Sequence, residues 1–260
     1  MKSTLKECQD LCTADLLALI RGDFLALRIS HFYPRAQCEQ VAERVLDYPA
    51  LRQFKLATRM ERYGPSLGES AGSPVAMQAY QQAAAEEVGA FRALCSPYLT
   101  PIDKLRLALD EAWPAGAHLG VINGSKAFTG VVRIVNAGGS TEPHQDRLIA
   151  GDIDLSASIA EQLAANIYLR TSSKGGELEI WDLSLPRSAY QSIRAPGKAG
   201  VLRDQLPPST LRIGPEQGDL ILFRSTSMHA IVMTEGARQR IACATFIGYR
   251  SDQQPLVFYC

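Results

Sequence analysis

The chain has 260 residues, of which 46% are hydrophobic and 21% are charged, and its 27 basic residues balance its 27 acidic ones. These proportions are typical of a globular protein and exclude a disordered or collagen-like chain. The balanced charge and the lack of a basic run disfavour a nucleic-acid partner.

The N-terminal segment and the cysteines bear on location. The first residues, MKSTLKE, are polar where a signal peptide needs an apolar core, and no stretch reaches the ~20 apolar residues of a membrane-spanning helix. The six cysteines are scattered without a Cys-x-x-Cys pair, which favours reduced thiols. We therefore expect a cytoplasmic protein with no membrane partner.

The first part of the chain, residues 1–115, is predicted to be mostly helical. Apolar periodicity indicates helices over residues 14–20, 35–46, 74–94 and 101–112, and alternation indicates one strand over 23–29. Segment 59–73 is rich in Gly and Ser and carries two arginines and a tyrosine. Loops of this length often cover a site, although many are solvated connectors, so both interpretations are kept.

From residue 116 onward the pattern changes to short β-branched and aromatic runs separated by Gly, Pro, Asn and Asp. Candidate strands cover residues 117–122, 129–136, 164–169, 177–181, 200–206, 211–213, 219–223, 229–233 and 239–249. Many short strands with Gly and Pro turns indicate a sandwich or barrel. We predict an α+β protein with a mainly β core, built as a single domain over 1–260, in which a helical support region (1–115) packs on the β core (116–260).

The chain has four histidines, and two of them predict a metal site together with one aspartate. His144 and Asp146 are two residues apart on an extended segment, so their side chains point to the same side while Gln145 turns away. His229 begins a distant apolar strand that can lie alongside them. Two imidazoles and one carboxylate are the ligands that hold non-haem Fe(II) and leave other positions open. The other two histidines, His31 and His118, are interpreted as surface residues.

The strand after His229 carries two arginines. Arg238 and Arg240 share a face of this strand with Ala242, Ala244 and Phe246, an environment that predicts a pocket rather than solvent for at least one arginine. A guanidinium can bind a carboxylate through two parallel hydrogen bonds. A dicarboxylate that chelates the metal at one end could therefore be held here at the other.

Five segments, in chain order, resemble the Fe(II)/2-oxoglutarate-dependent oxygenases, especially the prolyl-hydroxylase-like branch. These segments are His144-x-Asp146, Tyr168-Leu169 followed by Gly175-Gly176-Glu177-Leu178, Gly218-Asp219-Leu220-Ile221-Leu222-Phe223, His229 and Gly236-x-Arg238. The resemblance covers roughly residues 125–250 and implies a double-stranded β-helix, or jelly roll, with a helical N-terminal layer.

The resemblance also implies roles for individual residues. His144, Asp146 and His229 would bind Fe(II), and Arg238 would pair with the distal carboxylate of 2-oxoglutarate. Tyr168 would hydrogen-bond the same co-substrate, and Asn166, on the same strand face, would line its cavity. Arg240 is an extra arginine where a small hydroxyl residue is common, so it is an alternative partner for 2-oxoglutarate or for a substrate carboxylate; Arg170 replaces a common Asn.

The implied reaction consumes O2 and 2-oxoglutarate, releases succinate and CO2, and hydroxylates an unactivated C–H bond. Members that halogenate have a small residue at the aspartate position, so Asp146 favours hydroxylation, with desaturation or cyclisation also considered. Neutral charge and a compact domain favour a small-molecule substrate, such as an amino acid or a natural-product intermediate. Polar groups expected near the site that would suit a substrate carboxylate are Arg62, Tyr63, Arg133, Arg147 and Arg240.

Two functions from other classes remain as alternatives. One is a non-catalytic jelly-roll sensor that binds a metal or ligand, and the other is a cupin-like metal-dependent isomerase or hydrolase. A homodimer is also considered. The intact set of three ligands and an arginine argues for catalysis, because a binding protein has no need of all four.

Overall fold

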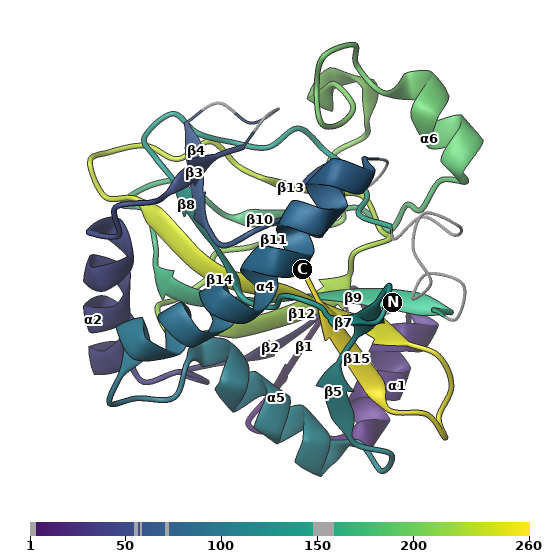
Figure 1. The fold of residues 1–260 in the computed structure, drawn as a ribbon. Helices are drawn as coiled ribbons and strands as arrows, with labels where there is room; N and C mark the ends of the chain where they lie inside the picture. The colour runs from purple at the N-terminus through teal and green to yellow at the C-terminus, as the bar shows by residue number, and fades with distance from the viewer. Residues whose placement is uncertain (1–3, 55–56, 58, 71–72, 148–158) are drawn as a thin grey trace.

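The computed structural model describes residues 4–54, 57, 59–70, 73–147 and 159–260 (Figure 1). The helices are α1 (Thr13–Arg21), α2 (Arg35–Leu46), α3 (Leu67–Ser70), α4 (Pro74–Cys95), α5 (Pro101–Ala112) and α6 (Arg187–Ile193), with a 3₁₀ turn at Arg203–Gln205. The strands are β1 (Leu5–Cys8), β2 (Ala26–Ile29), β3 (Arg52–Gln53), β4 (Met60–Tyr63), β5 (Ala117–Leu119), β6 (Val121–Ile122), β7 (Ser125–Lys126), β8 (Val131–Val135), β9 (Glu161–Arg170), β10 (Leu178–Ile180), β11 (Leu211–Ile213), β12 (Leu220–Arg224), β13 (His229–Ile231), β14 (Arg240–Tyr249) and β15 (Leu256–Tyr259).

A large, mainly antiparallel sheet forms the centre of the molecule. Its strand order is β1-β2-β12-β9-β14-β8-β4-β3, and β15 pairs with both β14 and β5. Only the β1–β2 and β15–β5 pairs are parallel among the pairings described. A second sheet has the order β11-β10-β13, and β6 pairs with β7. The mixed α+β class with a large sheet agrees with the prediction.

The large sheet separates a helical layer from the second sheet, as the alternation of β14 shows. Ile241, Cys243 and Ile247 face a core that they share with buried residues of α1, α2, α4 and α5. Ala242 faces the opposite core, which includes Leu178 of β10 and other residues of the second sheet. Burying a large aliphatic side chain contributes about 1.5–3 kcal/mol, so these two cores hold the layers together.

The end of helix α4 and the start of α5 show how local sequence fixes this support. Thr100 caps α5 by accepting a 2.9 Å hydrogen bond from the Asp103 backbone, and Pro101 occupies the first helical turn, where its missing N–H costs nothing. Arg92 of α4 makes two 2.8 Å hydrogen bonds to the Asp103 carboxylate. The helical layer is therefore tied together by one carboxylate.

Several predicted elements match the structure and others do not. The helices predicted at 35–46 and 101–112 and the strand at 211–213 are confirmed at their ends. The strand predicted over 200–206 is wrong: Arg203–Gln205 form a 3₁₀ turn, and the apolar Leu202 is 39% exposed rather than packed. The expectation of a single strand in the first 115 residues is also wrong, because β1, β3 and β4 are short and polar strands that are stabilised by pairing with other strands.

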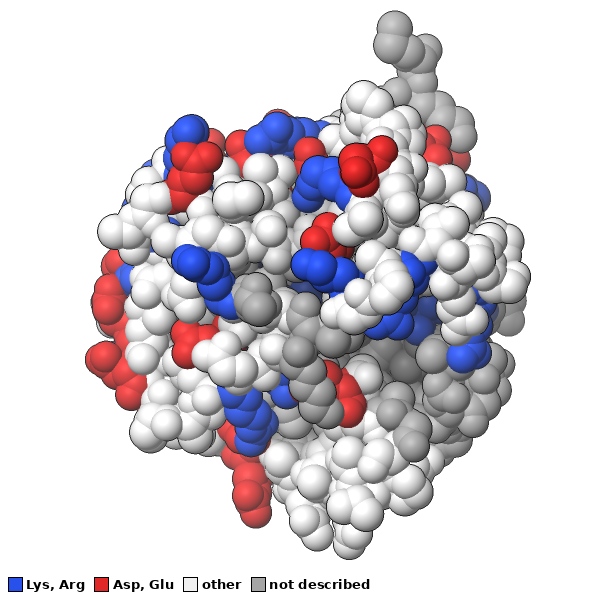
Figure 2. Space-filling view, turned by 90° about the horizontal axis from the view of Figure 1, so that it is seen from above, with Lys and Arg blue, Asp and Glu red and all other residues white. Residues whose placement is uncertain are grey.

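The described part of the chain has neither a membrane-spanning helix nor, on the face seen from above, a patch of one charge (Figure 2). No helix among the described residues is both long and apolar enough to cross a membrane. On the face seen from above, the described Lys, Arg, Asp and Glu side chains are interspersed rather than gathered into a patch of one sign (Figure 2). This pattern agrees with the balanced charge of the whole chain.

Candidate metal centre

The two histidines of the predicted metal site lie side by side on paired backbone segments. His144 and His229 form an antiparallel bridge with two backbone hydrogen bonds of 2.9 Å, and their ring centroids are 4.3 Å apart. Each Nδ1 lies within hydrogen-bonding distance of the carbonyl two residues earlier, at 2.8 Å for Glu142 and 2.9 Å for Ser227. These carbonyls fix the ring orientation and leave both Nε2 atoms free to bind a metal.

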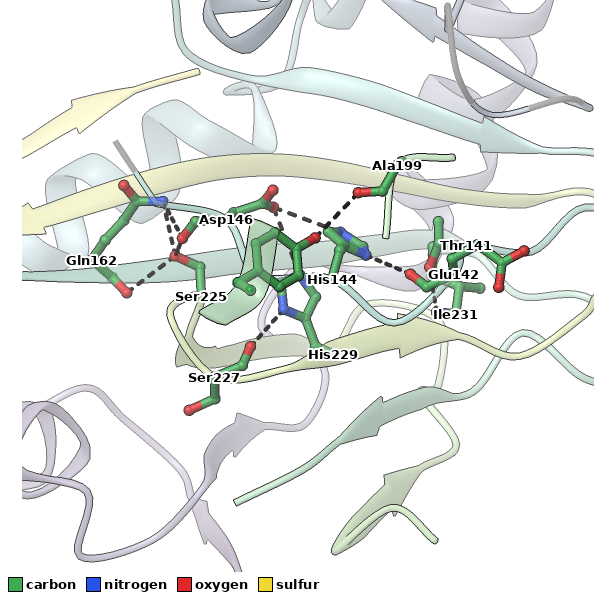
Figure 3. A network of polar contacts seen from close by, with 11 residues as sticks. Thr141, Glu142, His144, Asp146, Gln162, Ala199, Ser225, Ser227, His229 and Ile231 are labelled. Carbon is green, nitrogen blue, oxygen red and sulfur yellow. Dashed lines mark hydrogen bonds and ion pairs between the residues drawn. The ribbon is translucent and has the colours of Figure 1, made fainter. Parts of the chain in front are cut away.

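Asp146 completes the group from the same side. Its Oδ2 lies 3.8 Å from Nε2 of His144 and 3.6 Å from Nε2 of His229. One ligand atom from each of the three residues lies within 4.8 Å of the others. Figure 3 shows the carboxylate and both imidazoles pointing toward one another. The i, i+2 spacing therefore brings both side chains together, as predicted from the sequence.

A buried polar network holds the backbone of Asp146. Its amide donates a 2.9 Å hydrogen bond to the Ser225 carbonyl, and its carbonyl accepts from Ser225 Oγ at 3.0 Å and Gln162 Nε2 at 3.1 Å (Figure 3). The Tyr259 hydroxyl donates to Gln162 Oε1 at 2.8 Å. These contacts come from β9, β15 and the turn after β12, so three segments fix the position of one ligand.

The protonation of these groups suits metal binding. Burial and the neighbouring His229 lower the pKa of His144 to about 4, so its imidazole is neutral at pH 7. Burial would raise the pKa of Asp146, but the neighbouring imidazoles of His144 and His229 outweigh burial and hold this pKa well below its usual range. Neutral imidazoles and an ionised carboxylate are the forms that bind a metal.

The three ligands line a cavity of about 660 Å³ between the two sheets. This volume lies in the range of small-molecule sites. Much of the remaining lining is apolar, including Met60, Val131, Phe223 and Phe246. Segment 59–73, considered as a cover, contributes Ser66, Gly68 and Glu69 to this lining, while its residues 71–72 lie outside the described part of the chain.

The structure corrects the placement of the two arginines. Arg238 precedes β14 in a turn, its side chain is 47% exposed, and it lies 3.4 Å from Glu39 at the surface rather than in the cavity. Arg240 is 3% exposed, lines the cavity and donates from Nε to the Gly176 carbonyl at 2.9 Å. The expectation that Arg238 faces the pocket is therefore wrong, because the inward alternation begins only where the strand begins, at Arg240.

Tyr168 of β9 lies beside Arg240, and Asn166 of the same strand lines the cavity that Arg240 lines. The Arg240 guanidinium carbon is 4.8 Å from the centre of the Tyr168 ring. The Tyr168 hydroxyl is buried and has no hydrogen-bond partner among the described residues, and burial raises its pKa, so it remains a protonated donor. Asn166 is 6% exposed and lines the cavity.

Gly176 makes room for this arginine. Its φ of +78° favours glycine, and a Cβ there would approach Arg240 Cδ to 3.2 Å and Ser172 Oγ to 2.4 Å. The predicted Gly175-Gly176 turn thus supplies both a carbonyl partner and space for Arg240.

The remaining candidates lie in different places. His31 and His118 are exposed, as expected, and so is Arg147. Arg62 bonds Glu69 at 2.7 Å and Tyr63 donates to the Glu87 carbonyl at 2.8 Å, so both support the structure. Gln145 turns away from the ligands and exchanges two hydrogen bonds with the Leu185 backbone, as predicted. Arg170 contacts Glu39 and Glu43 of α2.

Arg133 of β8 also lines the cavity, although the sequence singled it out only as one of several polar groups. A signal for it exists, because it is the single charge in the apolar run Val131-Val132-Arg133-Ile134-Val135. The network of Gln162 and Ser225 was missed altogether. No sequence pattern marks it, because its members come from separate strands.

The donor chemistry fits an iron centre with a bound oxo acid. Two imidazoles and a carboxylate on one side are typical of non-haem Fe(II) sites with open positions. A buried guanidinium and an unpartnered buried hydroxyl, such as Arg240 and Tyr168, call for an anionic acceptor. The distal carboxylate of 2-oxoglutarate provides one.

Comparisons with known proteins agree with this chemistry. The family model described as "Carrier-protein-independent halogenase WelO5" matches residues 12–260. The L-gamma-glutamyl-L-propargylglycine hydroxylase of Streptantibioticus cattleyicolor is 30% identical over 166 residues, or 62% of this chain. The matched region spans 60% of that relative's length.

Solved structures show the same fold at low identity. An N-substituted L-amino acid dioxygenase from Burkholderia ambifaria, in complex with alpha-KG, is 17% identical with a TM-score of 0.66, covering 95% of this chain and 90% of that one. HygX from Streptomyces hygroscopicus, with nickel and 2-oxoglutarate bound, is 14% identical with a TM-score of 0.53, covering 92% and 87%. Both likenesses concern the α+β fold with its large sheet.

Proposed function

The chain belongs to the family of the carrier-protein-independent halogenase WelO5, and from this membership we propose that it is an Fe(II)/2-oxoglutarate-dependent oxygenase that hydroxylates a small, carboxylate-bearing molecule. The observation that carries the proposal is the meeting of His144, Asp146, His229 and Arg240 in one cavity. Three ligands leave metal positions for an oxo acid and O2, and the arginine supplies the charge that holds the oxo acid.

Asp146 favours hydroxylation over halogenation within this family. A halide bound to the metal needs a coordination position, and a protein carboxylate takes that position here. The Asp146 carboxylate lies within 4 Å of both imidazole Nε2 atoms, and the network of Ser225 and Gln162 holds its backbone in place. The chain therefore keeps the ligand whose absence would make room for chloride.

Arg240 is proposed to bind the distal carboxylate of 2-oxoglutarate, in place of Arg238. Its Nε donates to the Gly176 carbonyl, and none of the hydrogen bonds among the described residues uses its two terminal nitrogens, which could form a bidentate pair with a carboxylate. The Tyr168 hydroxyl would donate a further hydrogen bond, and Asn166 would line the same site.

When bound, iron and 2-oxoglutarate supply an oxidative decarboxylation to succinate and CO2 that activates O2 for attack on a C–H bond. The chain's own residues orient and shield this chemistry. His144, Asp146 and His229 would hold the metal on one side, and Phe223 and Ile231 provide apolar lining in the same cavity. Such lining limits the access of water to the reacting carbon.

We also propose that the two sheets form a double-stranded β-helix within a single domain over residues 1–260. Support comes from the antiparallel order β8-β14-β9-β12 in the large sheet and from the bridge that adds His144 to the edge of β11-β10-β13. The cavity between the sheets is then the mouth of a jelly roll.

An amino-acid derivative is the proposed substrate class. The curated relative acts, by its name, on a γ-glutamyl amino acid. The cavity here has the size for such a molecule and combines apolar lining with cationic groups.

A screen for succinate release tests this function. Fe(II)-loaded protein is incubated in air with 2-oxoglutarate and a panel of amino acids, N-acyl amino acids, γ-glutamyl amino acids and other small carboxylates, with succinate and hydroxylated product quantified. Anaerobic Fe(II) and 2-oxoglutarate should also give the weak visible charge-transfer band of chelation. The band without succinate from any compound would favour a sensor, and metal-dependent turnover without O2 consumption would favour an isomerase.

A further inference from the structure

Arg133 occupies the middle of β8, on the face of the large sheet that lines the cavity. Its partner across β14 is Ala242, and its partner across β4 is Arg62. Residues directly opposite each other in antiparallel strands share a sheet face. Ala242 provides neither charge nor hydrogen bond, so Arg133 has no acceptor on one side and a like charge on the other.

Of the two arginines that face each other, only Arg62 has a carboxylate partner among the described residues. Arg62 donates to Glu69 Oε2 at 2.7 Å and to the Gly64 carbonyl at 3.2 Å. Arg133 is half-buried, and no hydrogen bond or ion pair joins it to any residue in the described part of the chain. Like charges opposite each other are destabilising, and a charge removed from water without a partner is costly. Within the described part of the chain, this cation therefore lacks a partner that an external anion would supply.

The charges of the proposed cofactors do not supply that anion. The two positive charges of Fe(II) and the one of Arg240 are balanced by Asp146 and by the two carboxylates of 2-oxoglutarate. The two glutamates that line the cavity, Glu69 and Glu142, form ion pairs with Arg62 and Lys198. Among the described residues, Arg133 then remains without a paired carboxylate. Its position is close to both sites, because Arg133, Asp146 and Arg240 line the same cavity.

The surroundings of Arg133 define what the anion is attached to. Val131 on the same strand, Met60 of β4 and Phe246 of β14 line the cavity around it. An anionic group held at Arg133 would thus have an apolar remainder extending over these side chains toward the metal ligands.

We propose that Arg133 binds the carboxylate of the primary substrate and selects a monocarboxylate with an apolar side chain, an inference that rests on the proposed oxygenase function. The carboxylate is anchored on β8, and the apolar part of the substrate reaches the iron. Arg240 and Arg133 divide the two anions between them: Arg240 holds the co-substrate and Arg133 holds the substrate.

Matched carboxylate and amide probes test this assignment. Anaerobic Fe(II)-loaded protein is first saturated with 2-oxoglutarate and then titrated with N-acetyl-L-norvaline and N-acetyl-L-leucine, each beside its C-terminal amide. The shift of the charge-transfer band measures binding. Loss of a hydrogen-bonded charge pair costs about 1.5–3 kcal/mol, so the wild type should prefer at least one carboxylate over its amide by ~10-fold or more.

The variants are Arg133→Met, Arg133→Lys and the exposed control Arg238→Met. In Arg133→Met the affinities for the carboxylate and for its amide should lie within ~2-fold of each other. The affinity for 2-oxoglutarate should change by less than ~3-fold, which is too small a change for the loss of a charge pair. Arg133→Lys keeps the charge and should retain part of the preference; it also carries the comparison if the Met variant does not fold. The control should match the wild type.

Three results would overturn the inference and leave the oxygenase function standing: no probe carboxylate binds the wild type at millimolar concentration, the preference survives in Arg133→Met and Arg133→Lys alike, or these variants lose 2-oxoglutarate instead of substrate. If the wild type itself does not bind 2-oxoglutarate, the proposed oxygenase function is contradicted. This outcome is seen in the first titration, before any probe is added.

Discussion

Replacing Arg240 should remove 2-oxoglutarate binding, whereas replacing Arg238 should not. The proposed variants are Arg240→Met and Arg238→Met, because the unbranched Met side chain fills space without a charge. Arg240 is 3% exposed, and the loss of one partner of a buried charge pair costs roughly 2–5 kcal/mol. Taking about 3 kcal/mol, Arg240→Met should weaken 2-oxoglutarate binding by ~100-fold.

The effect expected for Arg238 follows from its exposure. Its side chain is 47% exposed and pairs with Glu39, whose side chain is 46% exposed. Exposed ion pairs contribute about 0–1 kcal/mol, so Arg238→Met should change the affinity for 2-oxoglutarate by less than ~5-fold. Arg240→Lys should be intermediate, because an ammonium keeps the charge but not the bidentate geometry.

The assay is an anaerobic titration of Fe(II)-loaded protein with 2-oxoglutarate, followed by the charge-transfer band, with thermal unfolding of each variant as the folding control. Equal losses in the two Met variants, or a larger loss in Arg238→Met, would refute the reasoning. Either result would mean that the exposed arginine turns inward when the co-substrate binds.

Three further predictions follow from single contacts. Asp146→Gly should abolish hydroxylation while leaving the melting temperature within a few degrees of the wild type, because it removes a metal ligand at the cavity surface. Full turnover by this variant would show that Asp146 is not a metal ligand. Gln162→Leu should weaken Fe(II) binding by ~10–100-fold in a competition with a coloured chelator, because the Asp146 carbonyl loses a donor; an unchanged affinity would limit the network to a structural role. Asp103→Asn should lower the free energy of unfolding by about 1 kcal/mol at pH 7, after allowance for the exposed Arg92. Burial would raise the pKa of Asp103, but hydrogen bonds from Arg92 depress this pKa in the folded protein. The stability that Asp103 contributes is therefore present above its unfolded pKa of about 4 and is lost as the pH falls through its folded pKa. Denaturant unfolding curves of the wild type and the variant should converge below pH ~3, and a difference that stays constant with pH would contradict the assignment.

The metal ligands could be predicted from the sequence because their geometry is local. Residues i and i+2 of an extended segment share a side whatever the rest of the fold does, so His144 and Asp146 needed only one distant partner. His229 was identifiable because it begins an apolar strand. The helices at 35–46 and 101–112 were predictable for a similar reason, since periodicity and a preceding Pro or Thr fix their limits locally.

The arginine that faces the cavity could not be predicted in this way, because alternation does not say where a strand begins. Arg238 and Arg240 have the same parity, and the difference arises from Glu39 on α2, 199 residues from Arg238, and from the space left by Gly176. The polar strands β1, β3 and β4 were missed for the same physical reason. Their stability comes from non-local pairing rather than from their own residues.

The chain belongs to a family named for a halogenase, yet it has an aspartate, Asp146, beside the two histidines of the candidate metal site. The hydrogen bonds around Asp146 bear on this difference. If a carboxylate in this position were adventitious, nothing would be expected to hold it, yet the backbone of Asp146 makes three hydrogen bonds to Ser225 and Gln162, and Gln162 is fixed in turn by Tyr259. These hydrogen bonds fix the backbone from which the Asp146 side chain extends toward the two imidazoles. They are consistent with the proposal that this carboxylate is a metal ligand and that the substrate is hydroxylated.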